Sequence, residues 1–243
     1  MSRLEKGKII VIEGGDASGK QTQTDILIAN LRALGVKIAT FDFPAYKSAT
    51  GKIVGGAFLG KPEICKSFFN EGTRNVDWRV ASMYYAADRL YNLGEINNLL
   101  NDGVYVILDR YTYSNMAFQG GKNNDPESRA TSYKWLEVLE YDLLGLSKPD
   151  LGIYLDVPVE VSLKLMKGRK KDGNEKDEKV LRMAKVAYGE IAEKYKLSVV
   201  QCTDKHGELR SREDIARQVL KIVADKFGIK LPFEEPEFFW NRF

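Results

Sequence analysis

The chain has 243 residues, of which 44% are hydrophobic and 29% are charged, and its formal net charge is +3. This small excess of positive charge argues against bulk nucleic-acid binding, so no nucleic-acid partner is expected. No apolar run approaches the length of a transmembrane helix, and residues 1–8 lack the apolar core of a signal peptide. Cys65 and Cys202 stand in no metal-binding spacing, which favours buried or free thiols. We therefore expect a cytoplasmic chain with no membrane partner.

A first strand is expected at residues 8–13, where Ile9-Ile10-Val11-Ile12 form the apolar run of a buried parallel strand, and residues 21–34 show a helical pattern. The glycine-bounded loop at residues 13–22 joins them, and strand, loop and helix together are the context of a phosphate-binding P-loop. Gly14 and Gly19 allow backbone N–H groups to turn toward an anion, and the helix N-terminus adds its positive dipole end. Lys20 adds a mobile positive charge. The expected phosphate-binding residues are Gly14, Gly15, Ala17, Ser18, Gly19, Lys20, Gln21 and Thr22.

The residue after Lys20 departs from the P-loop pattern G-x-x-x-x-G-K-[ST]. A Ser or Thr hydroxyl at that position holds magnesium, whereas this chain has Gln21. Either the amide oxygen of Gln21 or the hydroxyl of Thr22 could take over that role.

A second expected strand at residues 36–41 ends in Asp42-Phe43-Pro44. Residues 45–61 contain four glycines, which predicts a short helix between turns, and residues 62–76 give no clear pattern. Residues 77–100 are helical in pattern, and a third buried strand at residues 104–108 is followed by Asp109 and Arg110. Asp109 resembles a strand-end carboxylate of Walker B type, which holds magnesium directly or through water. The alternative is a carboxylate that pairs with Arg110.

A short helix is expected at residues 114–118, and Asp125 is the expected N-cap of a helix that continues to about residue 144. A fourth strand follows at residues 151–157, and Pro158 begins the next helix. Residues 167–179 carry many charges and two glycines, which favours a closing lid over the alternative of a solvated loop. The remaining elements are a helix at 180–195, a strand at 198–202 and a helix at 212–227. The aromatic tail at 229–243 either packs over the domain or binds a partner.

Strands that alternate with helices predict an α/β fold, here a P-loop three-layer sandwich. It would contain a five-stranded parallel sheet with helices on both faces, within one domain of residues 1–243. Ligands of such sheets bind beyond the carboxyl ends of the strands, where Asp16, Asp42 and Asp109 are expected to meet the P-loop. Phosphoryl transfer needs aligned substrates and positive charge around the transferred group. The candidate cations are Lys20, Arg110, Lys167, Arg169, Lys170 and Lys171.

Several segments together resemble the thymidylate kinase family, whose members phosphorylate dTMP with ATP. The resemblance extends from about residue 8 to the final helix. It rests on residues 13–22, Asp42-Phe43-Pro44, Tyr84-Tyr85-Ala86-Ala87-Asp88-Arg89, Asp109-Arg110-Tyr111, Ser114, Ala117-Phe118-Gln119-Gly120, Pro149-Asp150 and residues 153–158. It implies ATP as the phosphate donor, Mg²⁺ as the cofactor, and a homodimer formed through helix faces near residues 77–100 and 125–144.

By the same resemblance, Tyr85 stacks on thymine, and Arg89 reaches the exocyclic O4 of the base. Arg110 binds the monophosphate, Asp16 holds the sugar 3′-OH, and Phe118 excludes a ribose 2′-OH. The implied dTMP-binding residues are Asp16, Phe43, Pro44, Tyr85, Arg89, Arg110, Ser114, Phe118 and Gln119. The implied catalytic residues are Asp16, Lys20, Arg110 and Arg169.

Members of the family carry a catalytic arginine either in the P-loop or in the lid. The P-loop position is Ala17 here, and Arg169 lies in the expected lid, so the chain resembles the lid-arginine group. Tyr46 stands near the place where many members have a phosphate-binding arginine, and Lys47 could substitute for that arginine.

Three alternatives remain open on the sequence. The first is a related nucleotide kinase with a different acceptor. The second is a GTP-binding switch, although no Asn-Lys-x-Asp motif is present and the D-x-x-G at residues 142–145 lies in a helical pattern. The third is a P-loop module that binds nucleotide without catalysis, which the replacement at Gln21 suggests.

Overall fold

The computed structural model describes residues 6–166 and 178–231. Within these ranges, five parallel strands form one sheet in the order β2-β3-β1-β4-β5. The strands are β1 (Ile9–Gly14), β2 (Ile38–Asp42), β3 (Tyr105–Asp109), β4 (Leu151–Asp156) and β5 (Ser198–Gln201). All five expected strands are present, with ends that differ from the predicted ones by at most two residues.

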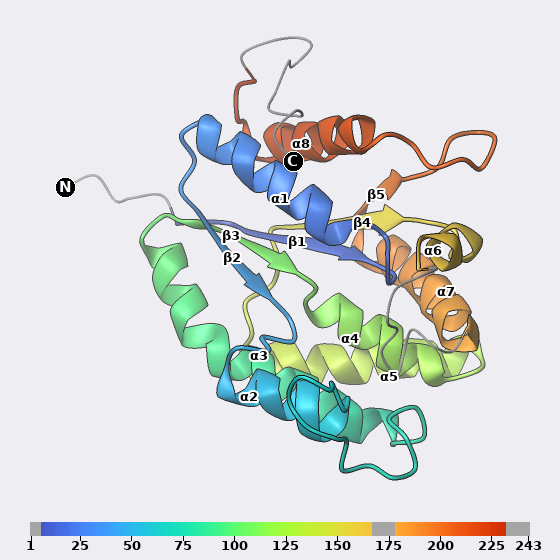
Figure 1. The fold of residues 1–243 in the computed structure, drawn as a ribbon. Coiled ribbons are helices and arrows are strands. Elements are labelled where there is room, and N and C mark those ends of the chain that lie inside the picture. Colours follow the sequence, from blue (N-terminus) through green and yellow to red (C-terminus); the bar gives the residue numbers. More distant parts are fainter. Residues whose placement is uncertain (1–5, 167–177, 232–243) are drawn as a thin grey trace.

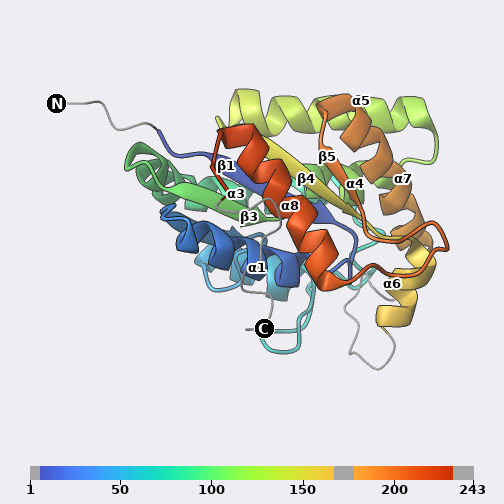
Figure 2. The ribbon, with the colours of Figure 1, turned by 90° about the horizontal axis from the view of Figure 1, so that it is seen from above.

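Helices cover both faces of this sheet (Figure 1). The helices α1 (Lys20–Ala33) and α8 (Arg212–Phe227) lie across one face, as the view from above in Figure 2 shows. Four helices pack against the other face. These are α3 (Trp78–Asn101), α4 (Thr112–Gln119), α5 (Pro126–Glu137) and α7 (Glu178–Tyr195). The expected three-layer arrangement is therefore confirmed.

Alternating side chains of β1 belong to two hydrophobic cores, one on each face of the sheet. Ile10 and Ile12 point toward α1 and α8, while Ile9 and Val11 point toward the four-helix face. All six residues of β1 are buried, as expected for a central strand of a parallel sheet. The edge strand β2 has no fully buried residue.

Shorter elements complete the fold. They are α2 (Ala49–Lys52), the π-helical η1 (Ile53–Phe58), the 3₁₀ turn η2 (Gly120–Lys122), the π-helical η3 (Val138–Leu143) and α6 (Val159–Leu165). The side chain of Asp125 accepts a hydrogen bond from the backbone N–H of Ser128 at 2.8 Å, which confirms its predicted role as an N-cap. Within the described ranges, no helix is both long enough and apolar enough to cross a membrane.

The expected boundary of the lid is wrong at its C-terminal end. Glu178 and Lys179 belong to the first turn of α7, because the helix begins two residues earlier than predicted. Lid residues 167–177, including Arg169, lie outside the described residues, as do tail residues 232–243. Of the expected tail, Ile229 and Leu231 pack against the core beneath α1 and α8.

Candidate functional site

The P-loop runs from the end of β1 into the first turn of α1, as predicted. A Cβ atom on Gly14 would lie 3.0 Å from the carbonyl oxygen of Leu155 and 2.6 Å from Oγ of Ser18, so this position has room for glycine alone. Gly19 has φ +82° at the N-cap, which a glycine adopts at little cost. Ala17 also has a positive φ, +55°, in the left-handed region that most residues avoid.

Lys20 lies folded over the loop. Its Nζ donates hydrogen bonds to the carbonyl oxygens of Gly14 at 3.2 Å and Gly15 at 2.8 Å. Burial and the nearby charge of Arg110 lower the pKa of Lys20 to about 8. A phosphate anion between these groups would draw the ammonium away from the carbonyls and favour its charged form.

Two strand-end carboxylates stand beside the P-loop. Asp42 and Asp109 occupy paired positions of β2 and β3, and burial together with the charge of Asp109 raises the pKa of Asp42. Oδ1 of Asp109 is buried, and it has no hydrogen-bond partner among the described residues. A divalent cation, or a water bound to one, would satisfy this oxygen, so the donor set fits magnesium. Among the described residues, no three His, Cys, Asp or Glu side chains gather into a metal site, so further ligands would have to be phosphate oxygens, waters or amide oxygens.

Gln21, the residue that departs from the P-loop pattern, lies in the first turn of α1 and faces the same cavity as Asp109. Its Nε2 donates a hydrogen bond to Oδ1 of Asp25 at 3.0 Å. This bond anchors the amide by its nitrogen and leaves the amide oxygen for another partner. Thr22 lines the cavity too.

A large cavity of about 650 Å³ extends along the P-loop. Asp16, Lys20 and Asp109 are among the residues that line it. It is also lined by Leu165 at the end of α6, by Leu209 and Arg210 of the segment before α8, and by Arg212 and Ile215 of α8 itself. The cavity thus combines polar and apolar walls.

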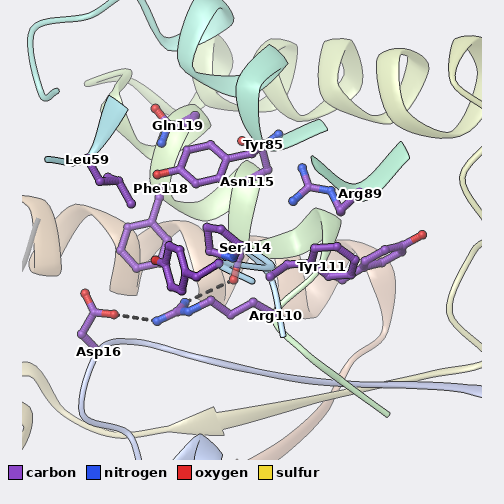
Figure 3. A pocket seen from close by; sticks show the side chains of 13 residues that line it. Asp16, Leu59, Tyr85, Arg89, Arg110, Tyr111, Ser114, Asn115, Phe118 and Gln119 are labelled. Carbon is purple, nitrogen blue, oxygen red and sulfur yellow. Dashed lines mark hydrogen bonds and ion pairs between the residues drawn. The ribbon is translucent and has the colours of Figure 1, made fainter. Parts of the chain in front are cut away.

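A second, narrower cavity of about 90 Å³ lies over α3 and α4 (Figure 3). All nine residues expected to bind the acceptor nucleotide line it: Asp16, Phe43, Pro44, Tyr85, Arg89, Arg110, Ser114, Phe118 and Gln119. Figure 3 shows Asp16 and Arg110 at one end and Tyr85 and Arg89 at the other. Residues from four separate segments therefore converge as the sequence predicted.

The two cavities meet at shared residues. Asp16 and Arg110 line both of them, as do Phe43, Pro44 and Tyr46. Any group that occupies one cavity next to Asp16 and Arg110 therefore faces the other cavity.

Arg110 is held by contacts on several sides. Its Nη2 donates to Oδ1 of Asp16 at 2.6 Å, and its Nη1 donates to the carbonyl oxygen of Gly14 at 3.1 Å and to Oγ of Ser114 at 3.2 Å. Its guanidinium also lies 5.1 Å from the ring centroid of Phe118. Burial disfavours its charge, but the Asp16 carboxylate raises the pKa of Arg110 above its ordinary value. Arg110 is therefore a cation at neutral pH.

The backbone conformation at Arg110 depends on Glu13, which the sequence reading did not single out. Arg110 has φ +67°, and the buried Glu13 carboxylate accepts hydrogen bonds from the backbone N–H groups of Tyr111 at 2.9 Å and Ser114 at 3.1 Å. It also accepts from the hydroxyl groups of Ser114 at 2.6 Å and Tyr188 at 2.9 Å. These bonds fix the sharp turn that directs Arg110 toward the P-loop. The sequence signal that could have identified this role is the glutamate itself, a charged residue at the end of a buried strand.

The base end of the narrow cavity contains two residues that sequence reasoning missed. Asn115 lines the cavity beside Arg89, and Glu140 from η3 lies behind both of them. Tyr85 is half-buried and packs edge-on against Phe58, with ring centroids 5.9 Å apart. No sequence signal marks Glu140, because it is one of several charged residues in a helical stretch.

The loop after Phe43 is fixed by Asp88 of α3. The buried Asp88 carboxylate accepts hydrogen bonds from the backbone N–H of Ala45 at 2.7 Å and from the hydroxyl groups of Ser48 at 3.2 Å and Thr50 at 2.8 Å. Tyr46 follows in this loop, and Nζ of Lys61 lies 4.3 Å from the centroid of its ring. Lys47, the residue that could substitute for a phosphate-binding arginine, is not among the residues that line either cavity.

The segments on either side of the lid pack against the P-loop. Met166, which follows α6, and Leu181 of α7 form a small buried cluster with Val159, and Ala17 and Leu163 pack against it. Ala17 of the P-loop therefore packs against a cluster built from the segments that precede and follow residues 167–177.

Comparison with known proteins agrees with this geometry. A family model described as thymidylate kinase matches residues 12–212. The thymidylate kinase of Plasmodium falciparum is 30% identical over 240 residues, which is 98% of each chain, and that of Schizosaccharomyces pombe is 31% identical over 186 residues, which is 76% of each chain. A solved structure of thymidylate kinase from Candida albicans, 24% identical, superposes with a TM-score of 0.70 over 93% of this chain and 94% of that one, which shows a shared fold. Since the family model spans well over half of its residues, the chain belongs to the thymidylate kinase family.

Proposed function

We propose that the chain transfers the terminal phosphate of ATP to dTMP, giving dTDP and ADP, with the two nucleotides meeting at Asp16 and Arg110. The observation that supports this most strongly is that the two cavities share these two residues. Direct transfer requires donor and acceptor phosphates to approach in line, and two separate cavities with a common mouth provide that approach.

ATP would occupy the large cavity. Its phosphates would lie against Lys20 and the N-terminus of α1, and its adenosine would extend toward Leu209 and Ile215. Asp109 and Gln21 are the residues that would hold Mg²⁺, directly or through water. The ion, when bound, neutralises charge on the phosphate oxygens.

The acceptor dTMP would occupy the narrow cavity. A nucleotide has to widen it, because typical ligand pockets measure roughly 300–1,000 Å³. Arg110 would bind the monophosphate, and Asp16 would accept a hydrogen bond from the 3′-OH. Phe118 would lie against the sugar and exclude a 2′-OH, while Ser114 and Gln119 complete the wall.

The thymine ring would stack on Tyr85 and present its N3–H and O4 to Asn115 and Arg89. Asn115 is an addition to the predicted set, supported by its buried Oδ1, which has no partner among the described residues. A pyrimidine N3–H would supply the missing donor.

Arg169 is proposed as the cation that closes over the transferred phosphate from the lid. Its support is the alanine at position 17, which leaves the P-loop without a cation at that point and packs against the buried cluster of Val159, Met166 and Leu181. A cation supplied at the transferring group is worth on the order of 10³–10⁵ in rate in this chemistry.

A homodimer is proposed through the outer face of α3. Val80, Met83, Leu90 and Tyr91 expose between 36% and 62% of their surface there. Met83 follows Val80 by three residues, and Leu90 and Tyr91 follow Met83 by seven and eight residues, which places all four along one side of the helix. We also propose a cytoplasmic location, since Cys65 and Cys202 are both free thiols.

The test of the proposed function is an assay that couples ADP release to an optical signal, with ATP, Mg²⁺ and one acceptor at a time. We expect dTMP to be phosphorylated far better than dCMP or UMP. Equal turnover of all three acceptors would favour the alternative of a nucleotide kinase with different specificity. Binding of ATP without any turnover would favour a non-catalytic module.

A further inference from the structure

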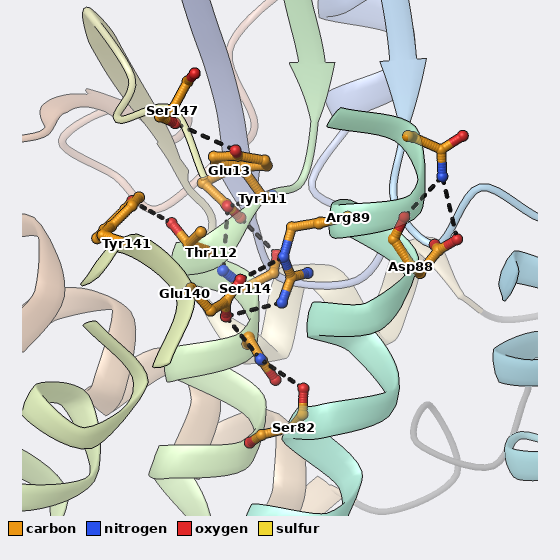
Figure 4. Close-up of polar contacts among 12 residues, drawn as sticks. Glu13, Ser82, Asp88, Arg89, Tyr111, Thr112, Ser114, Glu140, Tyr141 and Ser147 are labelled. Carbon is orange, nitrogen blue, oxygen red and sulfur yellow. Dashed lines mark hydrogen bonds and ion pairs between the residues drawn. The ribbon is translucent and has the colours of Figure 1, made fainter. Parts of the chain in front are cut away.

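One buried carboxylate holds both polar side chains at the base end of the narrow cavity. Glu140 is fully buried in the π-helical turn η3. It accepts hydrogen bonds from Nε of Arg89 at 2.6 Å and from Nη2 of Arg89 at 2.8 Å (Figure 4). It also accepts one from Nδ2 of Asn115 at 2.8 Å. Both base-end side chains are therefore oriented by the same group.

These bonds decide which atoms remain for a ligand. Nδ2 of Asn115 donates to Glu140 and, at 3.2 Å, to the carbonyl oxygen of Ser82, and both of these partners are acceptors. The amide nitrogen must therefore point away from the cavity, and the unpartnered Oδ1 is what Asn115 can offer to a ligand. Arg89 likewise directs Nε and Nη2 to Glu140, and among the described residues no hydrogen bond uses Nη1. Asn115 and Arg89 thus present one acceptor and one donor to the base end of the cavity.

We propose that Glu140 is a positioning residue. It fixes Asn115 as the acceptor and Arg89 as the donor at the base site, and so determines which pyrimidine base binds there. The inference rests on the proposed function, since it takes the narrow cavity as the site of the acceptor base. Thymine and uracil present a donor at N3 and an acceptor at C4, which match Asn115 Oδ1 and Arg89. Cytosine presents an acceptor at N3 and an amino donor at C4, so both contacts are reversed.

A carboxylate enforces this polarity because it can only accept. A glutamine at the same position would offer an amide N–H, which either opposes the N–H groups of Arg89 or allows the Asn115 amide to turn over. In the second case Asn115 would present its NH₂ group to the cavity, and the site would match cytosine better than before. Glu140 therefore acts on specificity without touching the base.

The test compares kcat/KM for dTMP and dCMP in wild-type protein and in Glu140→Gln, with ATP and Mg²⁺. We expect the ratio of dTMP to dCMP efficiency to fall by about tenfold or more, mainly through KM for dTMP. Glu190→Gln is the matched control, because Glu190 also pairs with an arginine, Arg129, through both carboxylate oxygens but lies outside both cavities. It should leave the ratio within about twofold of wild type. Equal losses for dTMP and dCMP in Glu140→Gln would overturn the proposal, because they would indicate a merely structural role.

Two further measurements test the proposal if Glu140→Gln does not fold. Glu140→Asp keeps an acceptor-only carboxylate, so it should retain the dTMP preference even where KM rises. The second measurement uses the wild-type protein and dTMP methylated at N3, which has no N–H to donate to Oδ1 of Asn115. In competition with dTMP, we expect the methylated nucleotide to bind about tenfold or more weakly than dTMP. Equally strong binding of the methylated nucleotide would overturn the proposal. Failure of the proposed function would appear separately, as absence of dTMP turnover in the wild-type protein.

Discussion

Replacement of Arg110 by alanine tests the role of the shared residue between the two cavities. The guanidinium carries two terminal nitrogens near the junction, one of them on Asp16 at 2.6 Å. A hydrogen bond to a charged group contributes about 1.5–3 kcal/mol. If both nitrogens bind the acceptor phosphate, their loss removes about 3–6 kcal/mol, which corresponds to roughly 10²–10⁴ in kcat/KM for dTMP.

A companion variant, Arg110→Gly, separates the effect of losing the guanidinium on activity from its effect on the stability of the fold. The residue at position 110 has φ +67°, a conformation that costs a non-glycine residue roughly 1–2 kcal/mol. Both variants lack the guanidinium, but glycine adopts this φ without strain. We expect Arg110→Gly to unfold at a higher temperature than Arg110→Ala, by about 2–8 °C, with an equally low kcat/KM.

Steady-state assays with dTMP varied at saturating ATP, together with thermal unfolding of each variant, measure both quantities. Recovery of activity in the glycine variant would show that strain at the turn, rather than the missing charge, caused the loss. A kcat/KM within about threefold of wild type in either variant would refute the assignment of the phosphate to Arg110.

Three further predictions concern other parts of the site. Burial lowers the pKa of Lys20 to about 8 in the free protein, so kcat/KM for ATP should fall as the pH rises through about 8. Lys20→Arg should abolish that inflection in the pH profile. An unchanged pH profile in this variant would show that the inflection belongs to another group. Arg169→Ala should lower kcat with a modest effect on KM for dTMP, since the contact proposed for Arg169 would strengthen in the transition state. A kinetic profile identical to that of Arg110→Ala would contradict this division of roles. Met83→Lys should shift the protein from dimer to monomer in sedimentation at micromolar concentration, whereas a wild-type protein that is already monomeric would refute the proposed interface.

The fold was predictable because its signals are local. The apolar run at residues 9–12 and the glycine pattern that follows it specify a buried strand and a phosphate loop without reference to any distant residue. The helix signal at Asp125 is local as well. The start of α7 was placed two residues too late because the charged residues Glu178 and Lys179 are as compatible with a helical turn as with a loop.

The site residues that the family resemblance implies could be predicted from the sequence. Residues whose roles depend on contacts with distant parts of the chain could not. Tyr85, Arg89 and Arg110 were expected in one cavity, and the structure places them there. Glu13 and Glu140 act through partners 25 to 175 positions away, such as Asn115 and Tyr188. A single sequence contains no pairing information over such separations, so buried carboxylates of this kind become visible with the fold.

The central claim is that phosphate passes directly between two nucleotides bound at the same time. Initial rates measured over a grid of ATP and dTMP concentrations, with Mg²⁺ present, test it most directly. Direct transfer predicts double-reciprocal lines that intersect, because both nucleotides must be bound before ADP is released. Parallel lines, with phosphate carried on the protein between two half-reactions, would contradict the account.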